Sequence, residues 1–117
     1  MGKLTTHVLD THSGIPAAGV RIEVRELLPA QAQLLGIYMT MENGRCVGAL
    51  LDDERFHPGR YELTFHVGDY FRGRGVALSD PAFIEEAIVR IGIAHADQHY
   101  HVPLLMTPWS YSVYRGG

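Results

Sequence analysis

The chain has 117 residues, of which 46% are hydrophobic and 20% are charged, so we expect one folded globular domain over residues 1–117. Its net charge of −3 argues against a general nucleic-acid-binding protein, which would carry a basic excess. The single cysteine, Cys46, excludes an internal disulfide and a cysteine-rich zinc site.

The first half of the chain shows strand patterns separated by turn sequences. We predict a strand over residues 4–9, followed by turn chemistry over residues 10–16. Residues 20–27 alternate apolar and polar side chains, which is typical of a strand with one buried face. A third strand is predicted over residues 34–41. Asn43–Gly44 follows it and is a strong signal for a β-hairpin.

The second half continues in the same way. Residues 61–67 alternate again, and strands are predicted over residues 101–106 and 110–114. Residues 84–94 fit a helical face as well as a strand, and their β-branched content favours the strand. One short helix is predicted between residues 67 and 78, although glycines weaken it.

Short strands separated by glycine and proline predict an all-β sandwich or barrel. A sandwich leaves edge strands that must be covered or paired, and pairing across subunits would make an oligomer.

Seven histidines are many for this length, and histidine suits proton transfer near neutral pH. They are His7, His12, His57, His66, His95, His99 and His101. For any single histidine, a surface or structural role is more common than a functional one. His99 and His101 would share one face of a strand, and a third ligand from His7, His66 or His95 would complete a zinc site. Spacing alone is weak evidence for such a site.

Other catalytic patterns are missing from the sequence. It has no Gly-x-Ser-x-Gly nucleophile elbow and no phosphate-binding loop of the Gly-x-x-x-x-Gly-Lys-Ser/Thr type. Cys46 is interpreted as a buried structural thiol. Arg45 follows the Asn43–Gly44 turn, so spacing alone indicates a solvated hairpin tip. The residues by themselves predict a β-rich domain with candidate acid–base histidines.

Three motifs together carry a family resemblance. Residues 4–11 read LTTHVLDT, residues 43–45 read NGR, and residues 99–105 read HYHVPLL, with YRG following at 114–116. In this order and spacing they resemble the 5-hydroxyisourate hydrolases, which are transthyretin-like proteins. The resemblance extends over nearly the whole chain.

The resemblance implies an all-β, transthyretin-like β-sandwich of two four-stranded sheets with one short helix. It implies a homotetramer, a dimer of dimers, with active sites in the clefts where dimers meet. The implied reaction is hydrolysis of 5-hydroxyisourate to 2-oxo-4-hydroxy-4-carboxy-5-ureidoimidazoline in urate degradation. Neither a metal nor an organic cofactor is implied.

The resemblance also assigns site residues. His7, Arg45 and His101 match the family's catalytic positions, and the tail matches its substrate-binding positions at Tyr114, Arg115 and Gly117. Gly117 stands where the family usually has serine, so the role of that hydroxyl is either lost here or replaced, with the terminal carboxylate of Gly117 as the candidate replacement.

These assignments fit hydrolysis of a cyclic amide. We expect His7 and His101 to orient and deprotonate a water molecule, because two neighbouring imidazoles disfavour double protonation. Arg45 offers a forked donor to substrate carbonyl oxygens and to the developing oxyanion. A ligand carrier on the same fold is the alternative, since a fold does not determine a function.

The ends of the chain predict its location. The N-terminal residues have no long apolar stretch typical of a signal peptide, and no run approaches the roughly 18 apolar residues of a membrane span. We therefore expect a cytoplasmic protein without a membrane partner.

Overall fold

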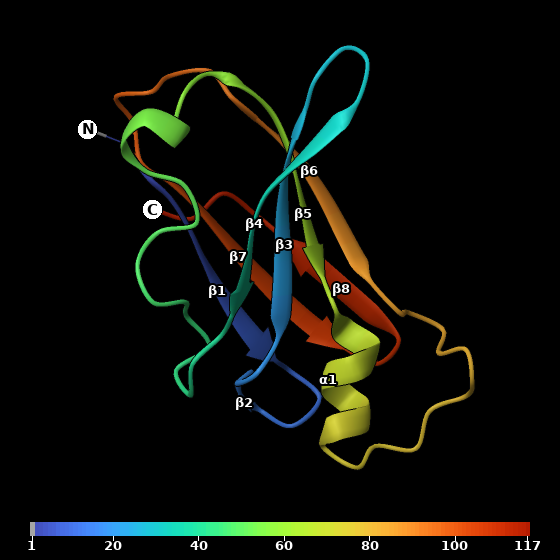
Figure 1. The fold of residues 1–117 in the computed structure, drawn as a ribbon. Coiled ribbons are helices and arrows are strands. Elements are labelled where there is room, and N and C mark those ends of the chain that lie inside the picture. The colour runs from blue at the N-terminus through green and yellow to red at the C-terminus, as the bar shows by residue number, and fades with distance from the viewer. Residues whose placement is uncertain (1) are drawn as a thin grey trace.

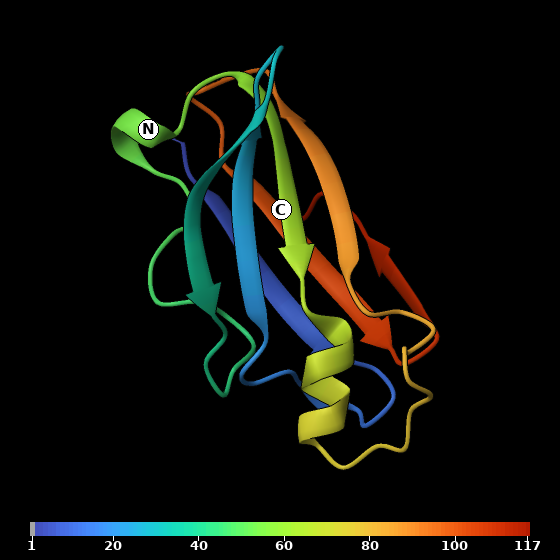
Figure 2. The same ribbon diagram turned by 45° about the vertical axis from the view of Figure 1, so that its right-hand side comes forward.

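The computed structural model describes residues 2–117, and its strands form two sheets packed face to face (Figures 1 and 2). Sheet A has the order β2-β1-β7-β8, with β1 at Leu4–Asp10, β2 at Ile15–Pro16, β7 at Tyr100–Thr107 and β8 at Ser110–Val113. Sheet B has the order β4-β3-β5-β6, with β3 at Arg21–Leu27, β4 at Ala32–Met39, β5 at Gly59–Phe65 and β6 at Ala87–Ile93. The predicted sandwich of two four-stranded sheets is confirmed.

The ambiguous segment and the predicted helix both occur as expected. Strand β6 occupies Ala87–Ile93, so the strand interpretation of residues 84–94 is confirmed over most of that range. Helix α1 covers Val67–Gly73, inside the predicted window. The structure adds one short 3₁₀ turn at Asp53–Arg55, which was not predicted.

The interpretation of Asn43–Gly44 as a β-hairpin is wrong in one respect. The turn exists, with Gly44 at φ 81° and the Met41 amide donating to the Arg45 carbonyl at 2.7 Å. It does not lead into a neighbouring strand of sheet B. The chain instead crosses to sheet A, where Arg45 bridges to His7. The Asn43–Gly44 sequence specified that the chain reverses direction here. It did not specify which strand the chain would pair with after the turn.

The core lies between the two sheets. Strand β1 alternates buried and half-buried residues along its length, as expected for one face packed against the other sheet. Tyr61, Phe65 and Phe71 are among the largest fully buried side chains. Helix α1 presents Val67, Tyr70 and Phe71 to the core, and their i, i+3, i+4 spacing defines one helical face.

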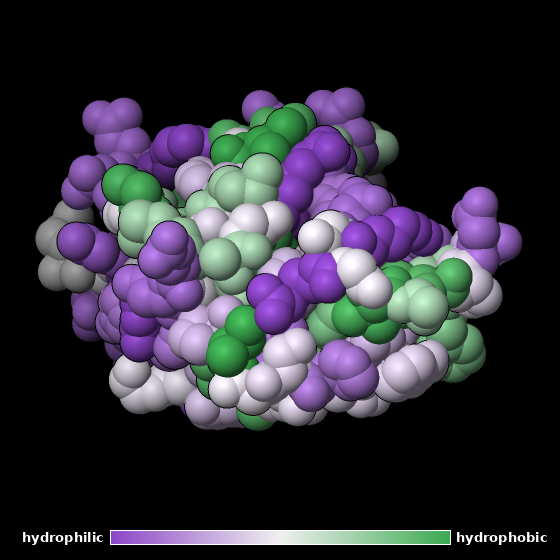
Figure 3. All heavy atoms as spheres, turned by 90° about the horizontal axis from the view of Figure 1, so that it is seen from below, coloured by the Kyte–Doolittle hydropathy of each residue, from purple (hydrophilic) through white to green (hydrophobic). Residues whose placement is uncertain are grey.

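Helix α1 closes one end of the sandwich (Figure 1). Viewed from that end, apolar side chains lie in separate patches among polar ones (Figure 3). Among residues 2–117, no helix is long and apolar enough to cross a lipid bilayer.

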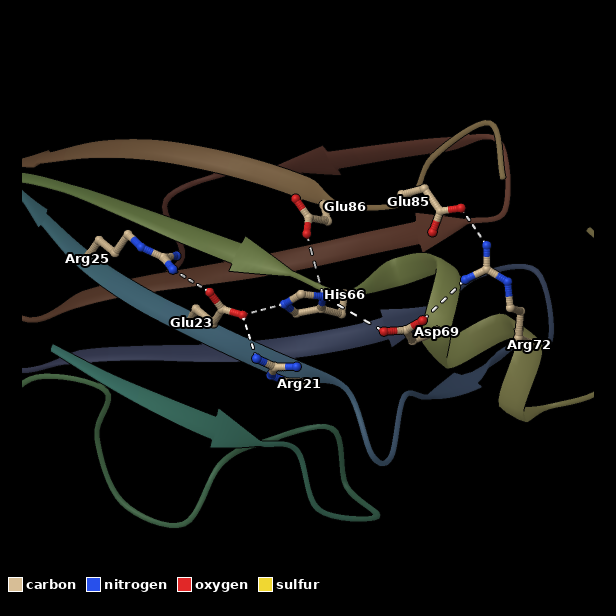
Figure 4. Close-up of polar contacts among 8 residues, drawn as sticks. All are labelled: Arg21, Glu23, Arg25, His66, Asp69, Arg72, Glu85 and Glu86. Carbon is tan, nitrogen blue, oxygen red and sulfur yellow. Dashed lines mark hydrogen bonds and ion pairs between the residues drawn. The ribbon is translucent and has the colours of Figure 1, made fainter. Parts of the chain in front are cut away.

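A charged cluster joins β3 to the start of α1 (Figure 4). The nearly buried Glu23 carboxylate accepts from His66 Nε2 at 2.7 Å, and it pairs with Arg25 at 2.7 Å and Arg21 at 3.0 Å. These bonds, above all the one from His66, hold the pKa of Glu23 below its usual value. Glu86 lies 3.7 Å from the other ring nitrogen of His66. This histidine therefore has a structural role, because one ring nitrogen is hydrogen-bonded to Glu23 and the other faces Glu86.

Candidate active site

The two histidine motifs meet because β1 and β7 pair in parallel. The register places Thr5 beside His101 and His7 beside Pro103. In both strands the buried residues alternate with these positions, so Thr5, His7 and His101 lie on the face of sheet A that points away from the core. The first and last motifs of the sequence thus form one surface.

Arg45 joins this surface through the segment that follows β4. That segment runs along β1, with the Val8 amide donating to the Gly44 carbonyl at 2.8 Å and the Leu4 amide donating to the Leu51 carbonyl at 2.9 Å. His7 and Arg45 form an antiparallel bridge. Arg45 is thereby held against β1, in place of the solvated hairpin tip that spacing alone indicated.

The turn before Arg45 also fixes the His7 ring. His7 Nε2 donates to the Asn43 carbonyl at 2.8 Å, and the Asn43 side-chain oxygen accepts from the Arg45 amide at 2.9 Å. A neutral imidazole that donates through Nε2 has an unprotonated Nδ1. His7 is therefore both oriented and able to accept a hydrogen bond.

Gly44 is required for this close approach. A Cβ built there would lie 2.4 Å from the Val8 carbonyl oxygen, and the residue has a positive φ of 81°. We expect Gly44→Ala to destabilise the fold by about 2 kcal/mol or more, because backbone strain adds to a clash with backbone. Thermal or urea unfolding measures this change.

Gly14→Ala is the matched control for this prediction. Gly14 has a similar φ of 75° but nothing within 4 Å of the added Cβ. Its loss of stability should be roughly 1 kcal/mol, from backbone strain alone. Equal losses in the two variants would contradict the role given to the Gly44–Val8 contact.

The C-terminal tail reaches the same surface beyond the end of β8. The Gly116 amide donates to the His101 carbonyl at 2.8 Å, and the two residues form an antiparallel bridge. A Cβ on Gly116 would lie 2.7 Å from His101 Cδ2, so the tail packs directly on the imidazole. This contact needs glycine.

A hollow of about 330 Å³ opens at this place. It is lined by Thr5, Thr6, Arg45, Cys46, Gly48, His99, His101 and Gly117. The structure thus brings together four of the predicted site residues: His101, Arg45 and Gly117 in the lining, and His7 bridged to Arg45.

Tyr114 and Arg115 lie elsewhere within the single chain. Both line a second hollow, of about 180 Å³, whose wall includes Tyr100 and Val102. The Arg115 guanidinium lies 4.0 Å from the centre of the Tyr100 ring and donates to the His99 carbonyl at 3.2 Å. Their role in binding substrate stays a prediction.

The position of His101 lowers its proton affinity. Burial is the main cause of its lowered pKa, and the positive charge of Arg45 and electrostatic repulsion from the neighbouring His99 and His7 rings lower it further. A lowered pKa means that the ring is neutral at neutral pH and takes up a proton only in more acidic solution. His101 is therefore available as a general base at neutral pH.

This pKa has a measurable consequence. If His101 is the base, the rate falls as acidification protonates it, so kcat/KM should begin to fall only below the ordinary histidine pKa of about 6.5. A kcat/KM profile, together with NMR titration of the His101 ring, tests this. A His101 ring that titrates at or above the ordinary value would contradict it.

The other histidines are dispersed. His12 packs edge-on against Phe71 and Trp109, His57 contacts Tyr61, and His95 is exposed. His99 and His101 stack with ring centres 6.5 Å apart, so the prediction that they share a face is confirmed. Within residues 2–117, no group of three or more His, Cys, Asp or Glu side chains is placed to hold a metal ion.

The lining of the hollow includes Thr5, Thr6, Cys46 and Gly48, which the sequence did not indicate as site residues. Cys46 was interpreted as a buried structural thiol, but it is only half-buried and lies at the wall of the hollow, because its segment crosses to sheet A. Burial raises the pKa of its thiol, which disfavours the nucleophilic thiolate. Thr5 carries a hydroxyl between two imidazoles, and only the strand register shows this.

A family model described as HIUase/Transthyretin family matches residues 4–116. The chain belongs to the HIUase/Transthyretin family. A curated relative from Pseudomonas aeruginosa, named 5-hydroxyisourate hydrolase, is 51% identical over 99% of this chain and 92% of its own. A solved Klebsiella pneumoniae 5-hydroxyisourate hydrolase is 29% identical, with a TM-score of 0.82 over 100% of both chains.

Sea bream transthyretin, solved in complex with thyroxine, has a TM-score of 0.87 at 23% identity, over 97% of this chain and 94% of that chain. That likeness shows the fold alone. A protein solved as a 5-hydroxyisourate hydrolase and one solved with bound thyroxine thus share this backbone shape, so the shape alone does not determine a function.

Proposed function

We propose that this chain hydrolyses 5-hydroxyisourate to 2-oxo-4-hydroxy-4-carboxy-5-ureidoimidazoline. One observation carries the proposal: His7, Arg45 and His101 converge on one face of sheet A, around the hollow. This set provides a base and an oxyanion donor. The 51% identity to a protein named 5-hydroxyisourate hydrolase supports the choice of substrate.

In the proposed reaction a water oxygen attacks the carbonyl carbon of the cyclic amide. Neutral His101, with His7 orienting the water, takes the water proton, and Arg45 donates to the oxygen on which negative charge develops. The carbon–nitrogen bond then breaks, and the leaving nitrogen receives the proton from His101. These steps use neither a metal nor an organic cofactor.

The carrier alternative predicts binding without turnover. A carrier of this fold has no need for a base of lowered pKa beside an arginine, and this chain has both. The likeness to transthyretin supports the fold and not the carrier.

We also propose that residues 1–117 are one domain and that four copies form a dimer of dimers in the cytoplasm. The edge strands of the two sheets, β2 and β8 in sheet A and β4 and β6 in sheet B, support pairing between copies, because edge strands have free backbone groups. Light scattering coupled to size exclusion should give the mass of four chains. A monomer would contradict the assembly.

The direct test is an assay. Urate oxidase generates 5-hydroxyisourate, and its ultraviolet absorbance decays with and without the protein. We expect the decay to accelerate in proportion to protein concentration. No acceleration by the folded protein would overturn the hydrolase proposal, and ligand binding without turnover would support the carrier.

A further inference from the structure

The Thr5 hydroxyl links two histidines of the hollow. Thr5 Oγ1 lies 2.8 Å from His101 Nδ1 and 3.1 Å from His99 Nε2. The two rings are nearly parallel, at 18°, and both lie beside the outward face of β1. Three side chains thus form one hydrogen-bonded row ending at the proposed base.

A hydroxyl has one hydrogen, so this row has a direction. In one direction His101 Nδ1–H donates to Thr5, and Thr5 donates to His99 Nε2. In the other, His99 Nε2–H donates to Thr5, and Thr5 donates to His101 Nδ1. The first direction places the proton of neutral His101 on Nδ1 and leaves Nε2 unprotonated, whereas the second places it on Nε2.

Only the first direction is compatible with His101 acting as a base. When Nε2 takes a proton, both nitrogens of His101 become donors, so Nδ1–H must donate to Thr5. Thr5 then keeps its second bond only by donating to an unprotonated His99 Nε2. Within residues 2–117, His101 Nε2 has no hydrogen-bond partner and is the nitrogen left to meet a water molecule.

We propose that Thr5 and His99 are positioning residues that hold His101 as the Nδ1–H tautomer, so that Nε2 is the atom that accepts the proton of the attacking water. The row is anchored at its far end, since the Arg115 guanidinium donates to the His99 carbonyl and to Gln98 Oε1, each at 3.2 Å. This gives Arg115 an indirect part in the site through the backbone of His99. The inference rests on the proposed function for the identity of the reaction.

Substitutions at Thr5 distinguish the effect of its hydroxyl group from the effect of its side-chain packing. Thr5→Val keeps the shape and removes the hydrogen bonds, and it should lower kcat by roughly 10- to 100-fold with KM changed less than about threefold, because a wrong tautomer cannot act as the base. Thr5→Ser keeps the hydroxyl and should restore most of kcat. Thr11→Val is the matched control, because it removes a threonine side-chain bond to the Met106 carbonyl of β7, at the residue that directly follows β1 and outside the hollow.

A double-mutant cycle tests whether Thr5 and His99 act as one unit. His99→Leu removes the last acceptor and should lower kcat to a similar extent as Thr5→Val. The combined variant should lose little more than either single variant, since both break the same row. If the fold-losses in kcat of the two single variants multiply in the combined variant, the two residues act independently and the proposed hydrogen-bonded row is wrong. Full activity in Thr5→Val would also contradict it, as would a Thr5→Ser variant with a kcat as low as that of Thr5→Val.

The tautomer itself is visible without turnover. Nitrogen-15 NMR of the protein at neutral pH should show the His101 ring protonated at Nδ1. In Thr5→Val, the tautomer population of His101 should shift toward Nε2–H. A His101 ring protonated at Nε2 in the unmodified protein would overturn the inference even if the enzyme is active. Conversely, an inactive protein with His101 protonated at Nδ1 would overturn the proposed function and leave the tautomer assignment standing.

Discussion

The His101→Ala variant should lose about 10²- to 10⁴-fold in kcat on 5-hydroxyisourate, because general-base catalysis contributes this much to a rate. His101 is a neutral imidazole at neutral pH and lines the hollow beside Arg45. Its backbone bond to Gly116 does not involve the side chain, so the tail keeps its anchor in the variant. Ultraviolet decay of the substrate at saturating concentration gives kcat.

His95→Ala is the matched control for this prediction. It makes the same chemical change at an exposed histidine outside the hollow. We expect its kcat to stay within about twofold of the unmodified protein, since surface substitutions rarely affect a distant site. A His101→Ala protein that folds normally and keeps full activity would show that another group is the base.

Arg45 should have the second-largest effect. Arg45→Ala removes the charged donor at the developing oxyanion and should lower kcat by about 10²- to 10³-fold, as loss of one oxyanion donor does elsewhere. Arg45→Lys keeps the charge but lacks the forked pair of donors, so it should recover part of the loss and not all of it.

The same two variants should move the pKa of His101 differently. The Arg45 charge is one cause of the lowered His101 pKa, so its removal in Arg45→Ala should raise that pKa. The acid limb of kcat/KM would then shift to higher pH. Arg45→Lys should shift the limb less, because a positive charge remains. Arg60→Ala, at an exposed arginine on β5 of sheet B, is the control and should change neither quantity.

If Arg45→Ala left kcat unchanged but shifted the pKa of His101, Arg45 would not stabilise the oxyanion. Its role in lowering the pKa of His101 would still stand. If neither quantity changed, Arg45 would have no part in the chemistry. The two readouts therefore test two separate physical roles of one side chain.

Local patterns in the sequence determined most of the elements. Alternation over residues 20–27 predicted β3, and β-branched residues correctly favoured a strand where β6 lies. Both signals reflect which side of a single element is buried, and neighbours in sequence are enough to define that. The family motifs then pointed to His7, Arg45 and His101, and the family itself is confirmed, whereas the catalytic roles of these residues stay predictions.

Only the tertiary structure decided how those residues meet. Thr5 and His101 are 96 positions apart, and their contact depends on parallel pairing between the first and next-to-last strands. Likewise, the turn at Asn43–Gly44 was evident in the sequence, but its crossing to sheet A was not. Such contacts are set by how two whole sheets pack around one core, and no local periodicity records that choice.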